Sequence, residues 1–337
     1  MTAVDDGAAQ GLSSRPDVAR YPAVSLRAAE ALARAGGLLM RRLRWLELTP
    51  SYECNNRCLG CFSVVDRSPA MSPRETMANL ALGRNQGADC LWIGGGEPTL
   101  RRELFAVARE ARRMGYARVK LQTNGMMLAY PEYVRKCVEA GVTEVNLAIK
   151  GATAETHDAL TRTPGCHALV LQAMVQCRAQ GLALEADVLV YKRNAAEIPA
   201  MVRAYTPLGV ERYNLWMLSA SDDASREVRD EVPRIADVMP FVTEAMDLGL
   251  SVRPDFITSL HTPACTVPAS HRACLFSARD LDLLVTNPGG HRFRLETSPL
   301  EGGLYPDGCA SCSVRDRCGG VRADYAKHHG TLEFKAV

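Results

Sequence analysis

The chain has 337 residues, 47% of them hydrophobic, and a formal net charge of +2 at pH 7. Its length exceeds one typical domain, and the near-neutral charge without a purely basic stretch gives no indication of nucleic-acid binding. The first 20 residues carry no apolar run and Arg or Lys interrupts the longest apolar windows, which excludes a secretory signal and a membrane span and predicts a soluble cytoplasmic protein.

The N-terminal segment 1–42 is predicted to be a disordered stretch followed by a helix. Residues 1–20 are small and polar without periodicity. Residues 24–42 space their apolar side chains as one face of a helix does. We expect this helix to pack against the core, although a membrane surface is an alternative partner.

From residue 43, strands and helices alternate at a spacing of about 30 residues, which is typical of a parallel sheet with crossover helices. Strands are predicted at 43–50, 89–96, 117–125, 143–151, 182–191 and 211–218, and helices near 72–86, 100–114, 130–140, 166–180, 196–206 and 231–248. Six strand–helix units are too few for a complete eight-stranded barrel. Residues 43–250 therefore predict an α/β fold, a partial (β/α)6 TIM-type barrel with its chemistry at the carboxyl ends of the strands.

After residue 250 the pattern changes. Residues 281–296 predict a β-hairpin whose turn is the sequence NPGG. The hairpin lies between two groups of cysteines, at 265–274 and at 309–318. Residues 251–337 are therefore predicted to be a small cysteine-rich C-terminal extension.

The twelve cysteines are unevenly distributed, with three inside 54–61 and five inside 265–318. Because disulfides are rare in the cytoplasm, grouped cysteines there indicate metal ligands. The four single cysteines are expected to be small buried hydrophobic residues; they are Cys90, Cys137, Cys166 and Cys177.

The first group lies in the loop SYECNNRCLGCFS, directly after the first strand, with Cys54, Cys58 and Cys61 as its members. Thiolates at this spacing can converge on one iron–sulfur cluster. Three ligands leave one of four irons open, as catalysis on a metal requires, whereas a zinc ribbon needs two pairs of ligands. A purely structural metal site is the alternative.

This loop resembles the cysteine motif of the radical S-adenosylmethionine (radical SAM) superfamily, and GGGEP at 94–98 resembles the family's Gly-Gly-Glu motif. The resemblance implies a [4Fe-4S] cluster whose open iron binds S-adenosylmethionine and cleaves it reductively to a 5′-deoxyadenosyl radical. It also implies that Gly95, Gly96 and Glu97 lie at the methionyl amino group, with the Glu97 carboxylate as acceptor. A reductant such as flavodoxin or ferredoxin is the implied partner.

Weaker matches follow along the chain. Thr123 and Asn124 belong to a Thr-Asn-Gly sequence after strand three, and Asn146 lies where the family places a polar residue on the ribose or carboxylate. Arg162 resembles an arginine that contacts the carboxylate, and 188–198 resembles the region near the adenine. Surface or capping roles are the alternative for each. Gly60 departs from the usual aromatic residue before the third cysteine, which leaves the adenine contact unassigned.

The second cysteine group resembles SPASM and twitch extensions, which carry auxiliary iron–sulfur clusters. Five cysteines suit one such cluster, and Arg322 stands where the SPASM pattern has another cysteine. The predicted ligands are Cys309, Cys312 and Cys318, together with either Cys265 or Cys274. A structural four-cysteine zinc site is the alternative.

The sequence assigns no catalytic residue and does not fix the substrate. We expect hydrogen abstraction from a small sugar- or nucleoside-like metabolite, in an oxidation, an epimerisation or carbon–carbon bond chemistry. The short segment before the first strand counts against the alternative of a maturase for a ribosomal peptide or protein side chain. A non-catalytic iron–sulfur electron carrier is the alternative of another class; it has no need of the glycine-lined turn at 94–98.

Overall fold

A computed structural model describes residues 42–61, 63, 68–219, 226–298, 301 and 303–337. Residues 42–337 form one compact unit. The predicted disordered stretch and helix over 1–42 lie outside the described residues, apart from Arg42. No helix among the described residues is long and apolar enough to cross a membrane.

In the part of the chain that the structure describes, the main sheet has nine strands in the order β7-β6-β5-β4-β3-β2-β1-β8-β9, and every neighbouring pair is parallel except β8 and β9. Its strands are β1 (Trp45–Leu48), β2 (Cys90–Ile93), β3 (Arg118–Thr123), β4 (Glu144–Ile149), β5 (Ala183–Val190), β6 (Val210–Met217), β7 (Ile257–Leu260), β8 (Leu283–Asn287) and β9 (His291–Arg294). A second sheet pairs β10 (Gly303–Leu304) with β11 (Val321–Arg322).

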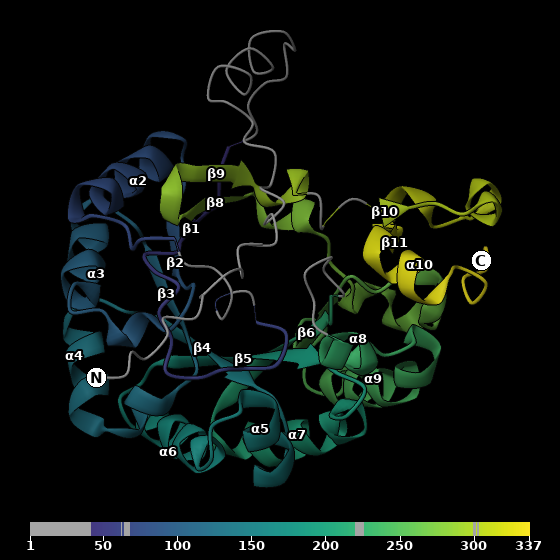
Figure 1. Cartoon of the computed structure of the whole chain (residues 1–337), viewed down its shortest axis with the longest axis horizontal. Helices are drawn as coiled ribbons and strands as arrows, with labels where there is room; N and C mark the ends of the chain where they lie inside the picture. The colour runs from purple at the N-terminus through teal and green to yellow at the C-terminus, as the bar shows by residue number, and fades with distance from the viewer. Residues whose placement is uncertain (1–41, 62, 64–67, 220–225, 299–300, 302) are drawn as a thin grey trace, which may run out of the picture. The chain divides into compact units, whose positions relative to one another are not determined.

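The helices that connect the parallel strands lie along the outer face of the curved sheet (Figure 1). They are α2 (Pro73–Asn85), α3 (Leu104–Arg113), α4 (Pro131–Glu139), α5 (Ala154–Thr161), α6 (Cys166–Ala179), α7 (Ile198–Tyr205), α8 (Arg226–Glu231) and α9 (Ile235–Leu250); α10 (Ala323–His329) follows β11. Helix α2 begins where it does because Ser72 and Glu75 form a reciprocal capping box ahead of Pro73.

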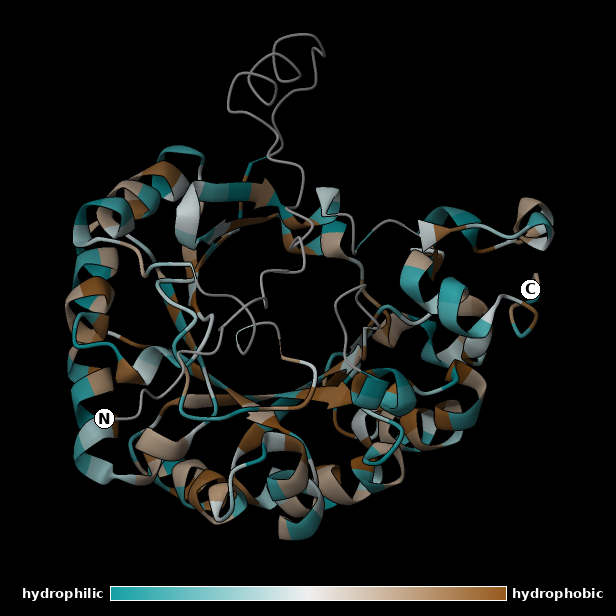
Figure 2. Ribbon diagram, viewed as in Figure 1, coloured by the Kyte–Doolittle hydropathy of each residue, from teal (hydrophilic) through white to brown (hydrophobic). Residues whose placement is uncertain are grey.

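The two faces of the sheet differ in chemistry because successive side chains of a strand point to opposite sides. Leu46 and Leu48 of β1 join the large apolar core beneath the helices, whereas Trp45 belongs to a separate aromatic cluster with Trp92. Figure 2 shows the strands as mainly hydrophobic and the helices as mixed, as expected for helices that bury one face. The inner face therefore carries this cluster together with polar residues such as Glu47.

The six predicted strand–helix units and the parallel partial barrel are confirmed. The hairpin at 281–296 is also present, but β8 pairs in parallel with β1, so the hairpin extends the main sheet. Among the described α-helices and strands, six were not predicted, namely α5, α8, α10, β7, β10 and β11. Their shortness explains this, since two to eight residues give little periodic signal.

Candidate functional site

The cysteine loop after β1 is held in place by its backbone. The N–H of Arg57 donates to the carbonyl of Thr161 at 3.2 Å, and the N–H of Leu59 donates to Leu160 at 2.9 Å. These bonds fasten the loop to the C-terminal end of α5. The Tyr191 hydroxyl, which follows β5, donates to the Leu59 carbonyl at 2.7 Å. The loop is thus fixed both by helix α5 and by the residue that follows β5.

The thiols of Cys54, Cys58 and Cys61 are free and half-buried. Burial raises the pKa of Cys54 to about 12, and the negative charges of Glu97, Cys58 and Cys61 act in the same direction. Burial also raises the pKa of Cys58, against the opposing charge of Lys150. The three thiols therefore lie close enough to feel one another's charge, and all three are softer, more polarisable ligands than a carboxylate.

Within the described part of the chain, no three His, Cys, Asp or Glu side chains are grouped as ligands of a single metal ion. A four-iron cluster attaches each thiolate to a different iron, so its ligands stand farther apart than those of one ion. Three converging thiols of this kind fit such a cluster.

Lys150 is a basic residue at this site that the sequence motifs did not indicate. Its ammonium lies 5.5 Å from the centre of the Tyr191 ring, and its charge acts on Cys58. It follows β4 on the same face as Asn146, because residues 146, 148 and 150 alternate in one direction. That alternation, read at the carboxyl end of the strand, is the signal that could have found it.

The glycine turn after β2 packs directly on the backbone that leads into the cysteine loop. Gly95 has φ +106°, and a Cβ there would lie 2.5 Å from Cγ2 of Thr49. A Cβ on Gly96 would lie 2.2 Å from the Glu53 carbonyl oxygen. The N–H groups of Gly96 and Glu97 donate to Ser51 at 2.9 Å and Glu53 at 2.7 Å. Only glycine permits this close backbone approach.

Glu97 is only 2% exposed, and its carboxylate is already engaged inside the protein. It accepts hydrogen bonds from the N–H and the hydroxyl of Thr99, at 3.0 and 2.5 Å. It also accepts hydrogen bonds from the Thr123 hydroxyl and the Asn124 N–H, both at 2.7 Å. Burial raises its pKa, while these hydrogen bonds act in the opposite direction. The predicted role of this carboxylate was to receive an ammonium group; in the structure it joins the turns after β2 and β3.

Asn124 extends this connection to the cysteine loop. Its side-chain N–H donates to Oδ1 of Asn55 at 2.7 Å, and its Oδ1 accepts the N–H of Met126 at 3.0 Å. Asn55 follows Cys54 directly. The three sequence motifs, at 54–61, 94–98 and 122–125, therefore form one hydrogen-bonded unit at the carboxyl ends of β1, β2 and β3.

The remaining predicted contacts lie in different surroundings. Asn146 is fully buried in β4, and its Oδ1 has no hydrogen-bond partner among the described residues. Arg162 ends α5 and forms an ion pair with Glu227 of α8, where both side chains are exposed. Gly60 has φ +73°, and a Cβ there would approach Val228 to 3.3 Å, which accounts for the absence of an aromatic residue at this position.

In the second cysteine group, the structure distinguishes two residues that the sequence could not. Cys265 lines one small pocket together with Cys309, Cys312 and Cys318. Cys274 is 1% exposed, and its thiol faces the Pro254 carbonyl at 3.9 Å. Backbone N–H groups of Val337 and Val314 lower the pKa of Cys312.

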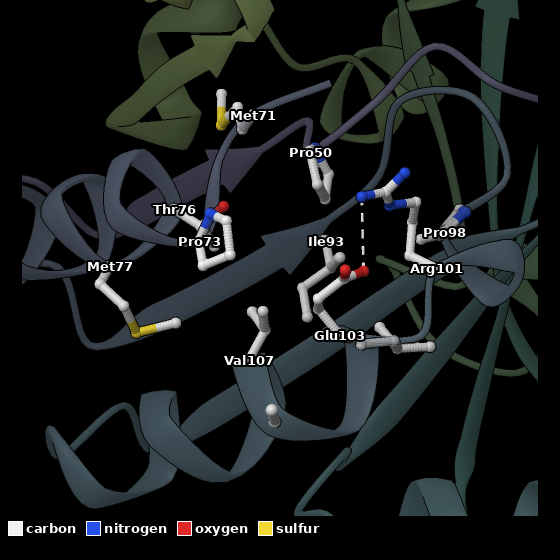
Figure 3. Close-up of a pocket in the computed structure, with 12 residues that line it drawn as sticks. Pro50, Met71, Pro73, Thr76, Met77, Ile93, Pro98, Arg101, Glu103 and Val107 are labelled. Atoms are coloured by element: carbon white, nitrogen blue, oxygen red, sulfur yellow. Dashed lines mark ion pairs between the residues drawn. The ribbon is translucent and has the colours of Figure 1, made fainter. Parts of the chain in front are cut away.

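The four single cysteines are all buried, which confirms the expectation for them. Figure 3 shows an apolar crevice between α2 and α3, where Ile93 and Val107 face each other and Arg101 pairs with Glu103 at 3.4 Å. This crevice contains no cysteine and lies on the helix-covered face of the sheet. Its residue Arg101 also pairs with Glu53 of the cysteine loop at 3.4 Å.

Comparisons with known proteins agree with this geometry. Residues 48–186 match the family described as the Radical SAM superfamily. An "AdoMet-dependent heme synthase" of Methanosarcina barkeri is 33% identical over 193 residues, which cover 56% of this chain and 54% of that protein. A "Probable GTP 3',8-cyclase" of Saccharolobus islandicus is 26% identical over 178 residues, which cover 52% and 57%. The chain thus spans about half the length of the curated relatives it matches.

Solved structures share the fold at low sequence identity. SuiB of Streptococcus suis bound to the precursor peptide SuiA has a TM-score of 0.63 and 14% identity, over 92% of this chain and 79% of that one. The structure described as "Native anSMEcpe with bound AdoMet" has a TM-score of 0.60 and 14% identity, over 87% and 92%. At such identities the likeness shows the fold alone.

Proposed function

Since this chain belongs to the radical SAM superfamily of enzymes, we propose that it acts on a small sugar- or nucleoside-like metabolite. In that family a [4Fe-4S] cluster cleaves S-adenosylmethionine reductively, and the resulting 5′-deoxyadenosyl radical abstracts hydrogen from the substrate. The observation that favours S-adenosylmethionine chemistry over electron transfer is the hydrogen-bonded unit that joins the cysteine loop to the turns after β2 and β3. An electron carrier needs ligands for its cluster but no such cradle beside it.

Cys54, Cys58 and Cys61 would hold the cluster. The turn at Gly95 and Gly96 would receive the amino group of S-adenosylmethionine through its backbone, because the Glu97 carboxylate is occupied by Thr123 and Asn124. The carboxylate of S-adenosylmethionine would pair with the ammonium group of Lys150, whose charge acts on Cys58. Arg162 remains a predicted contact for the same carboxylate, although its guanidinium pairs with Glu227 in this structure.

We further propose that Cys265, Cys309, Cys312 and Cys318 hold one auxiliary iron–sulfur cluster, as in a twitch-type extension. Two observations support this proposal. The four cysteines line one pocket, and Cys274 is buried in the core and does not line that pocket. The same four thiols also suit the alternative of structural zinc. Four cysteine ligands would leave no open coordination position for a substrate, on an iron–sulfur cluster or on zinc. We therefore expect this site to exchange electrons or to stabilise the extension.

The small-molecule substrate is favoured by the curated relatives, whose names refer to heme and to GTP. Modification of a peptide is the second candidate, suggested by the SuiB structure, which is described as bound to its precursor peptide. Flavodoxin or ferredoxin would supply the electron, and location in the cytoplasm stays a prediction from the sequence.

The direct test is anaerobic reconstitution with iron and sulfide, followed by addition of dithionite and S-adenosylmethionine. We expect 5′-deoxyadenosine to form, and the triple variant Cys54→Ala, Cys58→Ala, Cys61→Ala to form none. The control is Cys90→Ala, which changes a buried single cysteine and should keep the activity. Equal 5′-deoxyadenosine production by the triple variant would refute the proposal.

A further inference from the structure

The inner face of the sheet carries a polar network in which Asn146 is the one residue also predicted to contact the cofactor, among the described residues. Asp187 of β5 accepts two hydrogen bonds. One comes from Nε2 of Gln122 on β3 at 2.7 Å, and the other from Nδ2 of Asn214 on β6 at 3.0 Å. Oδ1 of Asn214 in turn accepts the hydroxyl of Thr258 from β7 at 2.9 Å. Four strands therefore position one carboxylate, only 7% exposed, on the concave side of the sheet.

Unsatisfied polar atoms point to a ligand at this network. Asn146 of β4 is fully buried beside Asp187, and its Oδ1 has no partner among the described residues. Nε1 of Trp92 is also unpartnered there, although this ring is 8% exposed. A Cβ on Gly94 would lie 3.0 Å from Oε1 of Gln122 and 3.8 Å from Nε1 of Trp92, which places both side chains around one point. Leaving buried polar atoms unpaired is costly unless a ligand or water pairs with them.

The charge of the inner face is unbalanced at the same place. Nζ of Lys120 lies 2.6 Å from Glu185, and Arg212 lies 3.4 Å from the same carboxylate, so these cations are already paired. Asp187 accepts hydrogen bonds from the side-chain amides of Gln122 and Asn214, and the charge of Lys120 acts to lower its pKa. Among the described residues, neither Asp187 nor Glu47 of β1 forms an ion pair. Burial raises the pKa of both, and the charge of Asp187 adds to the effect on Glu47.

We propose that Asp187, with Glu47, Asn146 and Trp92, forms a substrate subsite that binds amino and hydroxyl groups and rejects phosphate. This inference rests on the proposed function and narrows its substrate class to a hydrogen-bond donor such as an amino sugar or aminocyclitol. Carboxylates and amide oxygens accept hydrogen bonds, so a donor-rich ligand completes the network. A phosphate group would instead face two unpaired carboxyls in a poorly solvated site.

The test compares three matched sugars on the anaerobic holoenzyme loaded with S-adenosylmethionine. Glucosamine, glucose and glucose 6-phosphate share one ring and differ in charge. We expect calorimetric titration to show glucosamine bound at least about tenfold more tightly than glucose 6-phosphate, with glucose between them. Asp187→Asn should reduce this ratio to about threefold or less, and the surface control Asp237→Asn should leave it unchanged.

If Asp187→Asn fails to fold, Glu47→Gln supplies the second measurement, and we expect the same loss of preference. Tighter binding of glucose 6-phosphate, no binding of glucosamine, or an unchanged ratio in the folded variants would each overturn the inference. Cleavage of S-adenosylmethionine is assayed separately in the wild-type protein. Absence of that cleavage would refute the proposed function, whereas the binding ratios alone decide the subsite.

Discussion

The buried carboxylate of Glu97 accepts the backbone N–H of Asn124 at 2.7 Å, so two turns 27 positions apart share one acceptor. The same carboxylate binds the Thr123 hydroxyl, and Asn124 reaches the cysteine loop through Asn55. Geometry at the cysteines therefore depends on a residue that need not contact the cofactor.

Replacing Glu97 with Gln should destabilise the site without removing any ligand. A Gln amide turns one acceptor into a donor that opposes a backbone or hydroxyl donor, at a cost of about 2 kcal/mol in the free energy of unfolding. We expect weaker binding of S-adenosylmethionine, with the dissociation constant measured by equilibrium dialysis under anaerobic conditions. The control is Glu110→Gln on helix α3, whose side chain is 26% exposed, and equal affinity in both variants would contradict this role.

Gly96 and Gly165 allow the destabilisation caused by a steric clash to be compared with that caused by backbone strain. In Gly96→Ala the added Cβ meets the Glu53 carbonyl at 2.2 Å, so the backbone must shift. In Gly165→Ala the Cβ meets nothing within 4 Å, and only the positive φ of +81° is strained. Denaturant unfolding should show a loss of about 3 kcal/mol or more for the first and about 1 kcal/mol for the second. Similar losses would show that the close approach at Gly96 is not tight.

The two candidate cysteines of the second group should differ in iron content. Cys265→Ala removes a thiol from the shared pocket, so the reconstituted protein should fall from about eight irons to about four per chain. Cys274→Ala should keep about eight irons and lose about 1 kcal/mol through a small cavity. Iron is counted colorimetrically, with zinc measured in parallel. About four irons with one zinc in the unaltered chain would instead support the structural zinc site.

Glu47 should make stability depend on pH. Burial raises its pKa from 4.5 to about 7, so the folded state disfavours the ionised form. The stabilising contribution of protonated Glu47 is fully present at low pH. It is lost as the pH rises from the pKa of Glu47 in the unfolded chain through its pKa in the folded protein. Relative to Glu47→Gln, the wild type should therefore lose about 2 to 3 kcal/mol between pH 5 and pH 8. Urea unfolding of both proteins measures this, and a difference independent of pH would mean that Glu47 ionises normally.

The sequence was sufficient for the repeating part of the fold and for the cysteine motif. Strand β4 and helix α6 are mainly apolar, and Cys54, Cys58 and Cys61 lie close together in the sequence, within one loop. The partners of Glu97 were not predictable in this way, since a carboxylate in a Gly-Gly-Glu turn gives no indication of what it accepts. The choice between Cys265 and Cys274 likewise depends on tertiary packing, which places one at a pocket and the other in the core.

The pairing of β1 with β8 has a consequence for how the protein is made. The Thr286 hydroxyl donates to the Glu47 carbonyl at 2.8 Å, across 239 positions. During synthesis, the strand that leads into the cysteine loop has an unpaired edge until residues 283–287 have left the ribosome. Contacts of such high sequence separation form late, and exposed edges invite aggregation. Insertion of iron and sulfide should therefore follow translation, which favours slow expression and late iron supply when the protein is prepared.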